Sequence, residues 1–219
     1  MPRPLADLLS DDPALPELEQ WIADSPSAVT LLPAPEDAGA VLTALQVTTR
    51  SLLGTLAYSS GGVVVDGWVR IWGGGSEQLP RRLVPPGASF VVPPADGAPA
   101  KDATAAGMIL VGDDVAGGFF ALDGGALGDP GRIHYLGPDS LEWENLELGH
   151  GQWVAAMLSA NVHDFYTALR WPTWKEDVRD VPGDRSFNFF PPLWTKEGSV
   201  ASSDRRLVPA TEVWGLKRV

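Results

Sequence analysis

The chain has 219 residues and no cysteine, which excludes disulfides, thiolate catalysis and cysteine-based metal centres. Its formal net charge of −12 disfavours binding to nucleic acid or to an anionic membrane and favours basic partners. No apolar run approaches the ~20 residues of a membrane-spanning helix, and early aspartates interrupt any signal-peptide pattern, so we expect a cytoplasmic protein.

The first 60 residues predict helices. Residues 13–23 carry apolar side chains at a period near 3.6, which is typical of an amphipathic helix. A second helix is expected over residues 36–57, where acids begin the segment and the run Ser-Ser-Gly-Gly follows its end. We therefore expect residues 1–60 to form a helical segment that packs on a main domain of residues 61–219.

Residues 63–72 change the pattern from helical to alternating, which predicts a strand. One face of this strand carries Val63, Val65, Val69 and Ile71. The other face carries Asp66, Trp68, Arg70 and Trp72. We expect the first face to be core, and the second to lie against either solvent or a second layer.

Further strands are expected over residues 108–112, 118–123, 132–136 and 141–146, because short apolar runs there are separated by turn residues. Residues 93–106 show no periodicity and predict a loop or insertion. The expected strands over residues 108–112 and 118–123 are joined by a hairpin-like connection.

The C-terminal part predicts helices over residues 150–158 and 162–169, then an aromatic, proline-punctuated tail and a final strand over residues 212–216. Helices, an antiparallel meander and helices again define an α+β protein, with an antiparallel sheet flanked by helices. We expect one domain overall. The sequence contains no heptads or repeats from which an oligomeric state would follow.

Charge is unevenly distributed along the chain. Residues 111–147 contain eight acidic side chains and a single basic one, Arg132. Such a segment either serves solubility or attracts a basic partner. The tryptophans also allow two interpretations: they either pack loops onto the sheet or anchor a protein interface.

The sequence contains no recognised catalytic or metal-binding motif. The glycine-rich stretches lack the pattern of a phosphate-binding or dinucleotide-binding loop, and no serine sits on a G-x-S-x-G elbow. The spacing of His134, His150 and His163 matches no zinc site. An oxygen-only metal site would need Asp113, Asp114 and Asp123 to converge across a hairpin. We expect no metal, no cofactor and no catalytic residue.

Several strings resemble a bacterial family catalogued as a domain of unknown function, number 2625. They are Asp66 to Ile71, Asp113 to Gly125, Pro138 to Glu144, Phe165 to Trp171 and Glu212 to Leu216. The likeness covers roughly residues 40–216, and no activity follows from it. The strand pair around residues 117–124 is also similar, more loosely, to the SUKH superfamily, whose members include immunity and protein-binding modules. That likeness implies a binding role.

We therefore predict a non-catalytic protein-binding module that binds a basic partner through an acidic surface, and the likeness to SUKH proteins implies the immunity type. The candidate partner-binding residues are Asp66, Trp68, Trp72, Asp113, Asp114, Asp123, Glu142 and Glu144. The alternative is a small-molecule enzyme or a sugar-binding protein that uses Asp113, Asp123 and Glu142 with His134. That alternative requires these side chains to line one pocket.

Overall fold

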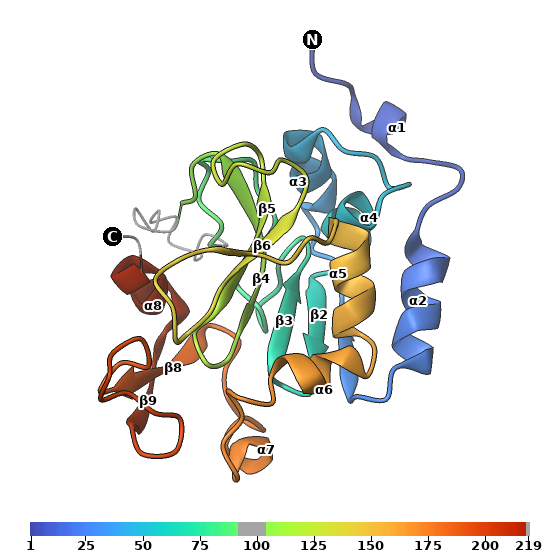
Figure 1. The fold of residues 1–219 in the computed structure, drawn as a ribbon. Helices are drawn as coiled ribbons and strands as arrows, with labels where there is room; N and C mark the ends of the chain where they lie inside the picture. Colours follow the sequence, from blue (N-terminus) through green and yellow to red (C-terminus); the bar gives the residue numbers. More distant parts are fainter. Residues whose placement is uncertain (92–103, 218–219) are drawn as a thin grey trace.

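A computed structural model describes residues 1–91 and 104–217 of the chain. Most of the loop predicted over residues 93–106 lies outside the described residues. The two ends of the described chain lie far apart in Figure 1, with the N-terminus beside helix α1 and the C-terminus beside helix α8.

A seven-stranded antiparallel sheet forms the centre of the fold (Figure 1), and its strands follow one another in space in chain order. The strands of this sheet are β1 (Val29–Leu32), β2 (Gly62–Val65), β3 (Val69–Trp72), β4 (Met108–Asp114), β5 (Phe119–Asp123), β6 (Ile133–Leu136) and β7 (Glu144–Asn145). A separate antiparallel ribbon contains β8 (Arg185–Phe190) and β9 (Asp204–Pro209). The fold is therefore α+β, as predicted.

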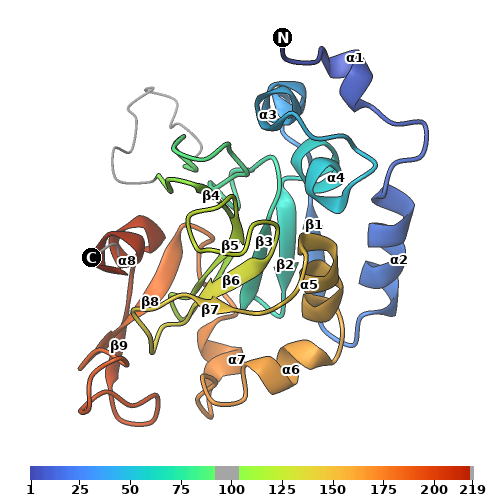
Figure 2. The ribbon, with the colours of Figure 1, turned by 45° about the horizontal axis from the view of Figure 1, so that its top comes forward.

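Helices flank the sheet, and α2, α4 and α5 lie together on one side of it (Figure 2). The helices are α1 (Leu5–Leu8), α2 (Leu15–Asp24), α3 (Ala38–Leu45), α4 (Leu52–Ser59), α5 (His150–Met157), α6 (Asn161–Phe165), α7 (Trp174–Asp177) and α8 (Ala210–Lys217). Helix α8 packs against the β8–β9 ribbon, away from α2. None of the described helices has the length and apolar character needed to cross a bilayer.

The helix predicted over residues 36–57 is in fact two helices, α3 and α4. Gln46 ends α3 in the left-handed conformation, with φ at 57°. Ser51 then begins α4 by accepting a hydrogen bond from the Gly54 N–H at 3.1 Å. A side-chain cap of this kind satisfies a backbone donor that the new helix would otherwise leave free.

The strand predicted over residues 63–72 is a hairpin of β2 and β3. Asp66, Gly67 and Trp68 connect the two strands, and Asp66 and Gly67 both have positive φ, 53° and 67°. The Trp68 N–H donates to the Val65 carbonyl at 2.8 Å and closes this turn. The register pairs Val63 with Ile71 and Val65 with Val69. Directly paired residues point to the same face of a sheet, so the predicted core face survives the correction.

The C-terminal prediction needs the largest correction, because residues 212–216 lie in α8 and not in a strand. The strands β8 and β9 were not predicted, and neither was β1. Strand β1 pairs with β2, so residues 1–60 contribute an edge strand to the sheet as well as helices.

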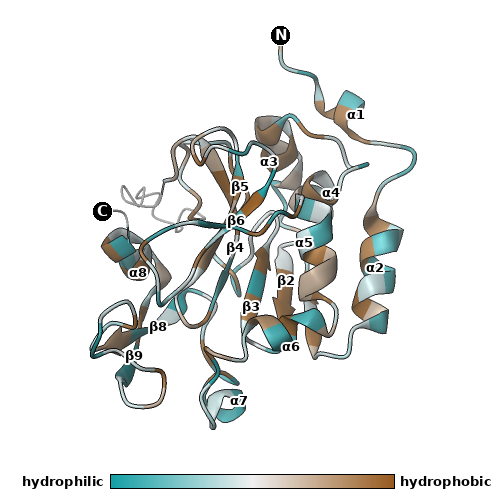
Figure 3. Cartoon of the chain, viewed as in Figure 1, coloured by the Kyte–Doolittle hydropathy of each residue, from teal (hydrophilic) through white to brown (hydrophobic). Residues whose placement is uncertain are grey.

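One connected apolar core extends from Leu8 and Leu18 near the N-terminus to Trp214 in α8. In Figure 3, β2 and part of β3 are coloured as hydrophobic, and Val63, Val65, Val69 and Ile71 of these strands belong to this core. Trp68 and Trp72 are completely buried there, so neither anchors an interface at the surface. The face of the β2–β3 hairpin that carries charged and aromatic residues thus packs against a second layer.

Candidate functional site

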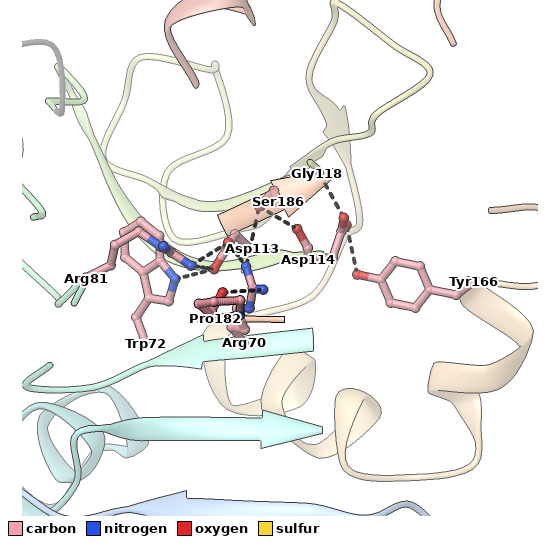
Figure 4. Close-up of polar contacts among 9 residues, drawn as sticks. All are labelled: Arg70, Trp72, Arg81, Asp113, Asp114, Gly118, Tyr166, Pro182 and Ser186. Carbon is pink, nitrogen blue, oxygen red and sulfur yellow. Dashed lines mark hydrogen bonds and ion pairs between the residues drawn. The ribbon is translucent and has the colours of Figure 1, made fainter. Parts of the chain in front are cut away.

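Two adjacent aspartates at the end of β4, Asp113 and Asp114, form the centre of a buried polar network (Figure 4). Neither has any exposed surface. Consecutive strand residues point to opposite faces, so each carboxylate meets a different set of partners. The prediction that these two acids lie on a binding surface is therefore wrong.

Asp113 is held by two arginines and a tryptophan. The Arg81 guanidinium donates to both carboxylate oxygens, at 3.0 and 2.7 Å, and Arg70 donates at 3.2 Å. The Trp72 indole N–H donates at 2.8 Å. Burial lowers the pKa of Arg70, and the adjacent Asp113 carboxylate opposes that effect. One carboxylate thus compensates part of the charge of two buried guanidinium groups, and every partner in the cluster belongs to the fold, which gives the cluster a structural role.

Asp114 is held by neutral donors. The Gly118 N–H donates to one oxygen at 2.9 Å, and the hydroxyls of Tyr135 and Tyr166 donate to the other at 2.6 and 3.2 Å. Burial raises the pKa of Asp114, while the donors from Tyr135 and Gly118 lower it. Burial also raises the pKa of both phenols well above the ordinary value, so the tyrosines remain donors. Asp114 thus joins the β4–β5 turn to β6 and to the end of α6.

Asp123 organises the loop that follows β5. Burial alone would raise its pKa, but the N–H groups of Leu127, Gly125 and Asp129 donate to its carboxylate and lower it. The residue is only 2% exposed. The Asp123 carboxylate accepts its hydrogen bonds from the backbone of this loop, so the prediction that Asp123 faces a partner is also wrong.

The remaining predicted site residues differ in accessibility. Asp66 has a side chain that is 15% exposed, and it accepts hydrogen bonds from the Ala28 N–H at 2.9 Å and the Ser27 hydroxyl at 3.0 Å. It therefore ties β1 to the β2–β3 turn. Glu142 and Glu144 are exposed, the latter on edge strand β7.

The residues of the enzyme alternative are not gathered in one place. Asp113 pairs with Phe119 and Asp123 pairs with Met108, which puts the two acids at opposite ends of the β4–β5 hairpin. His134 is buried on β6, next to edge strand β7. No group of three or more acidic or histidine side chains able to hold a metal ion occurs within residues 1–91 and 104–217.

Ser27, His163 and Asp66 form a constellation that the sequence did not reveal. The Ser27 hydroxyl lies 3.4 Å from His163 Nε2, and Asp66 lies 4.0 Å from His163 Nδ1. A catalytic triad requires Nε2 to accept the serine proton and Nδ1–H to donate to the aspartate. Here Arg170 approaches Nδ1 at 2.8 Å, and a guanidinium can only donate. Arg170 therefore engages Nδ1 in place of Asp66, and the Ser27 hydroxyl donates to Asp66 at 3.0 Å, so the contacts differ from those of a catalytic triad.

Arg170 fills an aromatic cage made by its own chain. Its guanidinium lies 4.1 Å from the Trp174 ring centre and 5.4 Å from that of Trp68. Burial lowers its pKa, and Asp66 opposes this. Because the cation is internal, the cage packs α6 and α7 onto the β2–β3 turn and is not open to a cationic ligand.

Of the eight acids within residues 111–147, the five that are exposed lie between residues 129 and 147. They are Asp129, Asp139, Glu142, Glu144 and Glu147. Arg132, the one base among them, uses its guanidinium to donate to the Glu147 carbonyl at 3.1 Å. We call residues 129–147 the acidic segment. It surrounds β7, at the edge of the sheet opposite β1.

The fold and these contacts define an α+β protein with a buried acidic network and an acidic sheet edge. The chain belongs to the family described as "Protein of unknown function DUF2625", whose model matches residues 5–213. It is 37% identical over 211 residues to the uncharacterised protein YbfG of Escherichia coli, covering 95% of this chain and 92% of the relative. An uncharacterised protein of Haemophilus influenzae is 33% identical over 192 residues, which cover 86% and 81% of the two chains. No solved structure gives a significant match.

Proposed function

We propose that the protein is a non-catalytic binding module that holds a basic protein partner on the acidic segment. The observation that carries this proposal is that the fold buries some of the acidic side chains and leaves others exposed. Asp113, Asp114 and Asp123 are buried and accept hydrogen bonds from other groups of the protein. By contrast, five acids of the acidic segment are exposed to solvent around β7. Charge of one sign on an exposed surface attracts oppositely charged partners and speeds their association.

The edge position of the acidic segment supports the same role. Strand β7 has only two residues and is the last strand of the sheet, so its outer side is accessible. Glu144 lies on this strand, and Glu142 and Glu147 flank it. A short, charged edge also disfavours pairing with the edge of a second copy. Self-association through the sheet is thereby discouraged, while a partner with basic side chains is attracted.

The resemblance to the SUKH superfamily motivates a narrower form of the proposal, in which the protein is an immunity-like module and its partner is a basic toxin. We propose the cytoplasm as its compartment, since the chain contains no cysteine, as is common in a reducing compartment.

Affinity capture from the native lysate tests this function, with the double variant Glu142→Lys/Glu144→Lys compared with wild type. The matched control is Glu17→Lys/Glu19→Lys on α2, where both acids are exposed and the change in net charge is the same. Reversing Asp113 or Asp114 is unsuitable, because either change would disrupt the core.

We expect wild type and the α2 control to retain one basic protein at low salt, and the acidic-segment variant to lose it. The retained protein is then purified and its binding measured directly with all three forms. Equal weakening of binding in both variants would show that net charge, and not the acidic segment, governs the interaction, and wild-type binding by both would show that neither does. Absence of any retained basic protein would contradict the proposal.

A further inference from the structure

A groove lies between the β8–β9 ribbon and α8, separate from the acidic segment. Its volume is about 440 Å³, which falls within the range of about 300–1,000 Å³ typical of small-molecule sites. The residues that line it and matter here are Asn188, Phe190, Trp194, Asp204, Arg206 and Leu216. Figures 1 and 2 show the ribbon and α8 side by side at the end of the molecule far from α2.

The walls of the groove are apolar and incompletely covered. Phe190 is 75% exposed and Leu216 is 47% exposed, while Trp194 is partly buried beside them. Large apolar side chains that gather around a concavity are a feature of binding sites. Lys217 holds this end of α8 in place by donating to the carbonyls of Gly137 and Ser140.

Three charged residues line the groove, Asp204, Arg205 and Arg206, and the first and the last have opposite charges on the same face of β9. The register pairs Asn188 with Arg206 and Phe190 with Asp204, so these four side chains share one face of the ribbon. Asp204 and Arg206 are two residues apart on β9, which separates their backbones by about 7 Å. Within the described part of the chain, neither side chain makes an ion pair or a hydrogen bond.

The neighbouring Arg205, unlike Asp204 and Arg206, contacts other side chains of the protein. It points to the other face of β9, where its guanidinium lies 4.5 Å from the Trp171 ring centre and 3.9 Å from Asp177. Arg205 is therefore engaged in the fold. Asp204 and Arg206 are exposed and remain available to a ligand in the groove.

We propose that this groove binds a free α-amino acid with a large apolar side chain. Arg206 would bind the carboxylate, Asp204 the ammonium group, and Phe190, Trp194 and Leu216 would contact the side chain. A simple apolar carboxylate would leave Asp204 without a partner, and a simple apolar amine would leave Arg206 without one. Only a zwitterion satisfies both groups. No residue of the acidic segment lines the groove, and this proposal goes beyond the proposed function.

The test is ¹⁹F NMR titration with 4-fluorophenylalanine and two analogues that each lack one charge. The N-acetyl derivative has no ammonium group, and the amide has no carboxylate. With wild-type protein we expect the zwitterion to bind best and each analogue to bind roughly five- to tenfold more weakly, as expected for loss of one charge-assisted contact.

Variants assign each contact. Arg206→Gln should weaken the zwitterion to the level of the amide, and Asp204→Asn should weaken it to the level of the N-acetyl derivative. Arg50→Gln, an exposed arginine far from the groove, is the control and should bind as wild type does. Both groove residues are exposed, so the variants should remain folded, which circular dichroism verifies.

Equal binding of all three compounds to wild type would overturn the proposal, as would no binding at millimolar concentration. Preference for either singly charged analogue would also overturn it, because the groove would then be selecting an apolar cation or anion. None of these outcomes bears on capture of a basic protein by the acidic segment, so the two proposals fail separately.

Discussion

Replacing Asp113 by Asn is the most informative perturbation of the buried network. The change keeps the size of the side chain but removes the charge that compensates Arg70 and Arg81, each only 2% exposed. Removing one partner of a buried ion pair costs roughly 3–5 kcal/mol of unfolding free energy, since the other charge stays buried. For a chain of this size the melting temperature should fall by about 10 °C.

A double-mutant cycle separates this effect from a general loss of packing. Arg81→Met alone leaves Asp113 with Arg70 and the Trp72 indole. In the double variant Asp113→Asn/Arg81→Met, one of the two uncompensated cations is gone. Its loss of stability should therefore be smaller than the sum of the single losses, by at least about 1 kcal/mol.

Urea denaturation followed by circular dichroism measures all four forms, and Glu142→Gln serves as an exposed control expected to lie within about 0.5 kcal/mol of wild type. The reasoning would be refuted if Asp113→Asn were as stable as that control. Strictly additive losses in the cycle would also refute it, because they would mean that Arg81 and Asp113 do not interact.

Two further predictions concern pH and glycine. Burial lowers the pKa of His150 to about 4 from its usual 6.5. As the pH falls, the unfolded chain therefore takes up the proton first. The contribution of His150 to the free energy of unfolding is fully present above pH 6.5, and it falls by up to about 3 kcal/mol as the pH drops to 4. His150→Leu should flatten that slope in urea titrations, and an unchanged slope would contradict the assignment. Gly118→Ala should destabilise the fold by roughly 1–3 kcal/mol, because a Cβ would lie 2.3 Å from Asp114 Oδ2 and 2.4 Å from the Tyr135 hydroxyl oxygen. The matched change Gly215→Ala meets no atom within 4 Å on α8 and should stabilise it by up to about 1 kcal/mol, so a loss of stability there would argue against the reasoning.

The fold class could be predicted because alternation and turn residues are local signals. Val63 and Ile71 were placed correctly on a core face even though the hairpin between them was missed. The Asp66-Gly67 pair is itself a hairpin signal that could have been used. The final helix α8 was missed because the short apolar run around Trp214 is compatible with either a strand or a helix.

The roles of the acids could not be predicted from local sequence. Asp113 and Asp114 look like turn residues between two apolar runs, and a buried carboxylate is recognised only by its partners. Those partners, Arg70, Arg81 and Tyr166, are supplied by segments 32 to 52 residues distant from the acids. A charged pair directly between two buried strands is nevertheless a signal, since an unpaired charge there would be strongly destabilising.

The central claim is that the exposed acidic segment, and not the buried acidic pair, forms the binding surface. The most direct test is the association rate of the captured basic partner measured against ionic strength. We predict that Glu142→Lys/Glu144→Lys lowers the rate at low salt by about tenfold or more and flattens its salt dependence, whereas Glu17→Lys/Glu19→Lys retains most of both. The same rate and the same salt slope for the two variants would contradict the account.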